Sequence, residues 1–193
     1  MIDIINYIID FSTNYIYTGG IFFGIFLLFI ENIIPVLPYS VFISLNCNAF
    51  GLFIGVLISW IGSIIGSYIV YSFYIFLSDK IDKIKFGEKL LKKMHNSICR
   101  FKTIGFSELV ILYTLPFSPS TVLHILCGLS GMKKKKYIIS ILFGKFFSIL
   151  FWGVVGLSII DNITDIKSII ITIIFLILVY IISKLINKKL NIE

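Results

Sequence analysis

The chain has 193 residues, of which 58% are apolar and 14% charged, and its formal net charge is +7. Soluble domains carry about 25% charged residues, so this composition excludes a soluble protein and predicts an all-α polytopic membrane protein. The basic residues gather in short segments beside apolar runs, which is typical of cytoplasmic loops. No basic patch lies away from such a flank, and nucleic-acid binding is therefore not expected.

The first elements in chain order are an amphipathic segment and a membrane span. Residues 2–14 place polar side chains on one helical face and isoleucines on the other, as expected for a helix at the membrane surface. The span is predicted at about residues 15–34. Gly20, Gly24 and Glu31 share one of its faces, and small residues at this spacing let a second helix approach closely. The Glu31 carboxylate is therefore expected to face protein rather than lipid.

Two stretches, about eighty residues apart, share one layout. Each has a Pro-x-x-Pro break, an apolar arm of about 8–12 residues, a cysteine and a turn of small residues. Arms this short are typical of re-entrant segments. Proline-interrupted segments at matching places in two halves of a membrane protein indicate a binding site between them. The prolines are Pro35 and Pro38 in the first stretch, and Pro116 and Pro119 in the second.

The remaining apolar runs predict three further spans. They lie at about 52–77, 137–160 and 167–187, and the first two carry stripes of glycine and serine suited to helix packing. Residues 79–102 form a basic amphipathic segment expected on the cytoplasmic surface. The loop charges predict cytoplasmic N- and C-termini and hairpins that enter from opposite faces. We therefore expect a single domain, an inverted repeat of two opposed re-entrant hairpins with about four transmembrane helices.

Two ionisable residues, Glu31 and Lys145, are predicted inside the membrane. An uncompensated charge at the centre of a span costs about 2.5–3.5 kcal/mol. One interpretation is a buried ion pair that fixes the packing; the other is that Glu31 exchanges protons at a cavity. His124 is either a proton relay or a hydrogen-bonded hairpin residue. The residues predicted to line a transport cavity are Glu31, Pro35, Pro38, Ser40, Asn46, Tyr113, Pro116, Pro119, His124 and Lys145.

The chain contains no motif of a soluble enzyme and no metal-ligand spacing among its three cysteines. We therefore expect a protein that is not an enzyme, with no catalytic residue, cofactor or metal. The expected partners are membrane lipids, and homo-oligomerisation is left open. The frequent use of Ile, Lys and Asn suggests an AT-rich, bacterial genome, and so the cell membrane.

The ordered set of these features resembles the DedA-like VTT-domain superfamily, also called SNARE-associated Golgi proteins. The resemblance covers about residues 20–160 and is carried by Glu31, the two Pro-x-x-Pro breaks, Asn46 and Phe50-Gly51. It implies two opposed re-entrant hairpins and movement of lipids across the bilayer. In bacteria the lipid would be a polyprenyl phosphate, in eukaryotes phospholipids, with proton coupling in some members. Glu31 matches the glutamate at the entry of the family's first hairpin.

The chain departs from the family pattern at two places. Ser40 stands where many members have an acidic residue, and Tyr113 stands where an arginine is expected. If that arginine binds phosphate, Lys145 is the residue here that would replace its charge. Three functions therefore stay open: a lipid transporter or scramblase, a proton-coupled carrier of a small solute or ion, and a non-transporting protein that organises the membrane.

Overall fold

The computed structural model describes residues 19–34, 38–81 and 97–161, with four single positions between 174 and 184. This part of the chain is all-helical, as predicted, and contains no strand. Several predictions lie outside it: the amphipathic segment 2–14, Pro35, most of the basic segment 79–102, and all but four positions of the span 167–187.

Two of the described helices are long and apolar enough to cross a membrane. They run over Leu52–Ser78 and Lys134–Ser158 and correspond to the spans predicted at 52–77 and 137–160. The predicted first span is described from Gly19 and is shorter. The bounds are Gly19–Ile33 for the first helix, α2 Tyr39–Phe50, α3 Leu52–Ile81, a short helix over 97–103, α5 Phe106–Thr114, α6 Ser120–Leu129 and α7 Lys134–Asp161.

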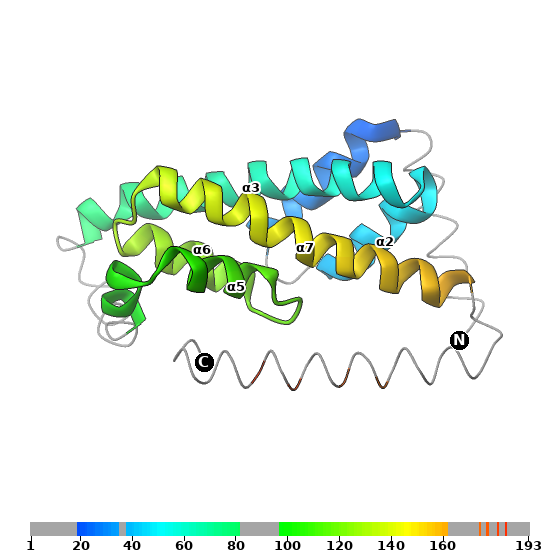
Figure 1. The fold of residues 1–193 in the computed structure, drawn as a ribbon. Coiled ribbons are helices and arrows are strands. Elements are labelled where there is room, and N and C mark those ends of the chain that lie inside the picture. Colours follow the sequence, from blue (N-terminus) through cyan, green and yellow to red (C-terminus); the bar gives the residue numbers. More distant parts are fainter. Residues whose placement is uncertain are drawn as a thin grey trace.

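The long helices α3 and α7 run antiparallel and in contact along the molecule (Figure 1). The short helix α2 packs on both of them, near the start of α3 and the end of α7. Farther along, α6 packs on α3 and α5 packs on α7. Each long helix therefore supports short helices from both halves of the chain.

Glycines and prolines set the ends of the short helices. Gly51 ends α2 with a φ of 78°, and Gly131 follows α6 with a φ of 65°, a region open to glycine at little cost. α5 stops at Thr114 because Leu115, which precedes Pro116, is held in an extended conformation. α2 and α6 thus each lie between a proline turn and a glycine turn.

Glycines on α3 and α7 bring helix backbones together. A Cβ added at Gly66 would lie 2.6 Å from the carbonyl oxygen of Phe29, on the Gly19–Ile33 helix. A Cβ added at Gly144 would lie 2.8 Å from the carbonyl oxygen of Val110, on α5. Such close contacts explain the small-residue stripes of the sequence. They also hold the segments that precede the two proline turns in defined positions.

Candidate functional site

A cavity of about 260 Å³ lies beside the second proline turn, at the start of α2 and of α6, and we call it the proline chamber. Glu31 and Tyr39 line it from the first half of the chain. Tyr39 and Ser120 are the first residues of α2 and α6, so both short helices begin at the chamber. The other lining residues belong to the second turn and the start of α6: Pro116, Ser118, Pro119, Ser120, Thr121 and Val122.

The chamber therefore receives two helix N-termini. The cap positions are Pro38 and Pro119, and neither provides a side-chain hydrogen bond to the first turn of its helix. The first amides of a helix have no partner within the helix, and the helix dipole makes this end positive. The chamber is consequently a favourable environment for negative charge, which Glu31 supplies.

A buried polar network extends from Glu31 to Lys145, which are 4% and 2% exposed. Asn32 lies between them. Its Nδ2 donates to Glu31 Oε2 at 3.0 Å, and its Oδ1 accepts from Lys145 Nζ at 2.5 Å. The two embedded charges are thus linked through an amide side chain, which gives each of them a hydrogen bond.

Two serines of α3 complete this network. Lys145 Nζ donates to Ser63 Oγ at 2.7 Å, and Ser67 Oγ donates to Asn32 Oδ1 at 2.9 Å. The network joins the Gly19–Ile33 helix to α3 and α7. Buried polar groups are costly unless they are hydrogen-bonded, so this set holds the three helices in one register.

Tyr39 stands between the proline chamber and Lys145. It lines the chamber and also a second, small cavity of about 20 Å³ that Lys145 lines. Lys145 Nζ lies 5.6 Å from the centre of the Tyr39 ring, a cation–π distance. The small cavity has room for about one water molecule. A group in the chamber is therefore separated from the ammonium group by one aromatic ring.

A second polar cluster surrounds His124, which is fully buried on α6. Its Nδ1 lies 3.0 Å from the Tyr113 hydroxyl and 2.9 Å from the Tyr137 hydroxyl. Tyr137 also donates to the carbonyl oxygen of Ser67 at 2.8 Å. The cluster thus adjoins the Lys145 network at α3, although His124 is not among the residues that line the chamber.

The structure brings together part of the predicted site. Glu31, Pro116 and Pro119 line the proline chamber, and Tyr113, Pro116 and Lys145 line the small cavity beside it. The remaining predicted residues lie elsewhere or outside the described part. Pro38 caps α2, Ser40 is in its first turn, Asn46 is buried where it donates to Gly24 O and Ser59 Oγ, His124 belongs to the tyrosine cluster, and Pro35 is not described.

Sequence reasoning missed the residues that connect the two charges. Asn32 directly follows Glu31, and its position next to an embedded carboxylate was a usable signal. Ser63 and Ser67 belong to the glycine and serine stripe that predicts helix packing, yet both hydrogen-bond to Asn32. Tyr39 and Tyr137 carried no sequence signal, because aromatic residues are common throughout this chain.

Two tryptophans of the long helices bind backbone carbonyls. Trp152 Nε1 on α7 donates to the carbonyl oxygen of Pro116 at 3.3 Å, and its indole meets the Phe117 ring edge-on. Trp60 Nε1 on α3 donates to the carbonyl oxygen of Leu142 at 3.0 Å. The first contact fastens the second proline turn to α7, and the second joins α3 to α7.

Comparison with known proteins finds a family domain that covers Tyr39, the second proline turn and Lys145, and that begins just after Glu31 and Asn32. Residues 34–158 match the VTT domain. The chain is 26% identical over 181 residues to "Uncharacterized membrane protein YhjE" of Bacillus subtilis, covering 90% of this chain and 83% of the relative. It is 25% identical over 152 residues to "Uncharacterized protein YqeD" of the same organism, covering 75% and 70%. No solved structure matches the chain significantly.

Proposed function

This chain belongs to the VTT-domain family of membrane proteins, and on that premise we propose that it is a lipid transporter, not an enzyme, of the cell membrane. The lipid head group would cross through the proline chamber. The observation that carries this proposal is the chamber itself, which Glu31, Tyr39 and the second proline turn line at the N-termini of two short helices. N- and C-termini would lie in the cytoplasm.

The short helices are proposed to be the re-entrant arms of opposed hairpins. α2 has 12 residues and α6 has 10, whereas a spanning helix needs about 20. Backbone that is not helical at membrane depth must lie within protein or line a wet cavity. The second proline turn meets this requirement, because Pro116, Ser118 and Pro119 line the chamber.

The charges favour an anionic head group such as a phosphate ester. Two uncapped helix N-termini attract negative charge, and Lys145 stands behind the Tyr39 ring. Glu31 is the anion that the folded chain itself places there. An incoming phosphate would compete with this carboxylate, and protonation of Glu31 would remove the competition. Coupling of lipid movement to protons follows from that exchange.

A carrier of small anions is the second candidate. The chamber volume of about 260 Å³ lies just below the range of about 300–1,000 Å³ of ordinary ligand pockets. A free inorganic or carboxylate anion would fit such a space as well as a lipid head group would.

The test is a flipping assay in liposomes. Purified protein is reconstituted with a head-group-labelled phospholipid, and separately with a labelled polyprenyl phosphate, with and without a pH gradient. We expect external quenching beyond the outer-leaflet fraction. Lys145→Met should lower the rate at least about tenfold, as loss of a buried charge contact does. Lys133→Met, which removes an exposed lysine near the start of α7, is the matched control.

One result would overturn the proposal, and a second would remove its proton coupling. Quenching that stops at the outer leaflet for both lipids, with folded protein, excludes lipid transport; uptake of a labelled anion by the same liposomes would then favour the carrier. Flipping that Glu31→Gln leaves equally sensitive to the pH gradient would exclude the proton role of Glu31 while keeping transport.

A further inference from the structure

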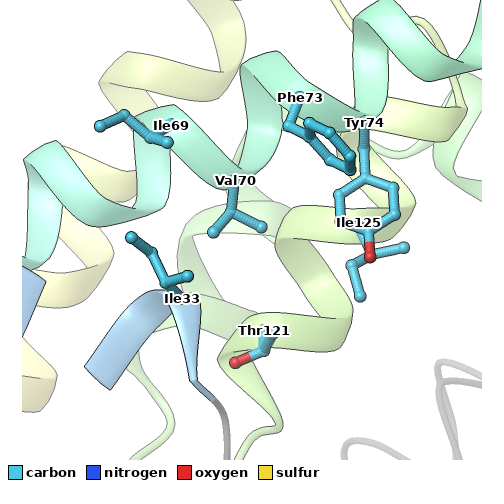
Figure 2. Close-up of a pocket in the computed structure, with 7 residues that line it drawn as sticks. All are labelled: Ile33, Ile69, Val70, Phe73, Tyr74, Thr121 and Ile125. Atoms are coloured by element: carbon cyan, nitrogen blue, oxygen red, sulfur yellow. The ribbon is translucent and has the colours of Figure 1, made fainter. Parts of the chain in front are cut away.

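An apolar groove of about 390 Å³ lies next to the proline chamber. It is bounded by the end of the Gly19–Ile33 helix, by α3 and by α6 (Figure 2). Three side chains from these segments, Ile33, Val70 and Thr121, face a common space in that view. The other lining residues are Ile69, Phe73, Tyr74 and Ile125.

The groove and the chamber meet at Thr121, which lines both of them. The first half of the chain repeats this adjacency, since Glu31 lines the chamber and Ile33, two residues later, lines the groove. Thr121 therefore stands at the boundary between the chamber and the groove.

The outer margin of the groove faces the surroundings of the helix bundle. Ile69 is 45% exposed, and Ile33 and Phe73 are exposed as well. In a membrane protein these apolar side chains contact lipid chains. Farther along α6, a Cβ added at Gly128 would lie 2.9 Å from the carbonyl oxygen of Tyr71, so α3 and α6 are in close contact there. The groove therefore opens sideways, between the same two helices, nearer the start of α6.

We infer that this groove holds one hydrocarbon chain of the membrane lipid whose head group enters the proline chamber. The inference rests on the proposed function and adds the path that the lipid's hydrocarbon chain takes. Lipid chains gain no hydrophobic free energy by moving from the bilayer into protein, so the groove does not attract the chain by itself. Its role is to let the chain stay in an apolar environment while the head group leaves the interface.

Photolabelling tests where the hydrocarbon chain of the lipid lies. The full-length protein is reconstituted in phosphatidylglycerol liposomes that contain a phospholipid with a diazirine on a chain carbon near the head group. After irradiation, cross-linked peptides are mapped by mass spectrometry. We expect cross-links within 69–74 and 121–125.

A tryptophan on α3 provides a matched pair of variants. Ile69 and Ile65 are both isoleucines with 45% exposure, one helical turn apart, but only Ile69 lines the groove. Ile69→Trp should lower the cross-link yield and the flipping rate by about tenfold, as steric filling of a packed site does. Ile65→Trp should change neither. Binding of glycerol phosphate, which has no chain, should be equal in both variants by calorimetry.

The outcomes separate this inference from the proposed function. Equal cross-link yields in the two variants, or cross-links spread evenly over the exposed face of α3, would refute the groove as the binding site of the hydrocarbon chain. This holds whether or not lipid is flipped. Cross-links that depend on Ile69 in a protein that flips no lipid would uphold the groove as a chain site and refute transport.

Discussion

The Nζ atom of Lys145 lies 2.5 Å from Oδ1 of Asn32, although 113 positions separate the two residues in the chain. The same amide donates to Glu31 through Nδ2. One side chain thus serves as acceptor for the buried cation and as donor to the buried anion. Among side chains only Asn and Gln carry an amide, which accepts at its oxygen and donates at its nitrogen, and Gln is longer by one methylene group.

Asn32→Ala should destabilise the protein strongly. Lys145 would keep Ser63 as its acceptor and lose the other, and a hydrogen bond to a charged group contributes about 1.5–3 kcal/mol. Thermal unfolding in detergent, followed by circular dichroism, measures the loss. Asn48→Ala, which truncates a half-buried amide on α2, is the control and should shift the midpoint little. Equal midpoints for the two variants would mean that the Asn32 bridge contributes nothing.

Lys145→Met and Glu31→Gln should not be additive. Each single change leaves one charge in the network without its counterpart, whereas the double change removes both. We expect the double variant to be more stable than the sum of the single effects by about 0.5–3 kcal/mol. Denaturant unfolding of the four proteins gives this coupling free energy. Additive effects would show that the two charges do not interact through Asn32.

Gly144→Ala should loosen the contact of α5 with α7. The added Cβ would lie close to Tyr113 Cβ and 2.8 Å from the carbonyl oxygen of Val110, and the backbone cannot yield as a side-chain tip can. Overpacking of this kind costs about 1–3 kcal/mol. Gly105→Ala is a suitable comparison, because its nearest contact would be an ordinary 3.6 Å. A thermal midpoint that falls as much for Gly105→Ala as for Gly144→Ala would contradict this account.

Tyr137→Phe should cost more than Tyr68→Phe. The hydroxyl of Tyr137 is hydrogen-bonded to the Ser67 carbonyl and lies 2.9 Å from His124 Nδ1, so its removal leaves buried polar groups without a partner. Such a loss is worth about 1–3 kcal/mol. The half-buried Tyr68 is in the middle of α3, and its ring lies beside Lys134. The unfolding midpoints of the two variants, measured side by side, test this. Equal decreases in the midpoint would contradict the prediction.

Cys99 offers a test of membrane orientation. It is exposed on the short helix over 97–103, whereas Cys47 and Cys127 are buried. A membrane-impermeant maleimide should label Cys99 in inverted vesicles and not in intact cells, if this segment lies in the cytoplasm. The variant Cys99→Ser should remain unlabelled in both preparations. Labelling of intact cells would reverse the predicted orientation.

The sequence predicted the fold where local rules dominate. Composition gave the membrane class, and hydropathy gave α3 and α7, because long apolar runs leave little alternative. Pro116 and Gly51 marked the ends of short helices, since their backbone restrictions act within a few residues.

The site was predicted less completely, because it depends on contacts between distant segments. Glu31 and Lys145 were recognisable as charges in apolar surroundings, but the choice of Asn32 as the group between them requires the packing of three helices. Asn46 is also a buried asparagine, yet it donates to Gly24 O and Ser59 Oγ in a separate contact. The position of Asn32 next to Glu31 marks it as a candidate, but its contact with Lys145 is visible only in the packed structure.

The hydrogen bond between Trp152 and Pro116 gives the protein an optical probe of its own. The chain has two tryptophans; Trp152 touches the second proline turn, whereas Trp60 donates to the carbonyl oxygen of Leu142. In a Trp60→Phe variant, the emission of Trp152 should report movement of that turn without any attached dye. Spectra recorded while lipid is added would then follow the second proline turn in real time, in the same sample in which flipping is measured.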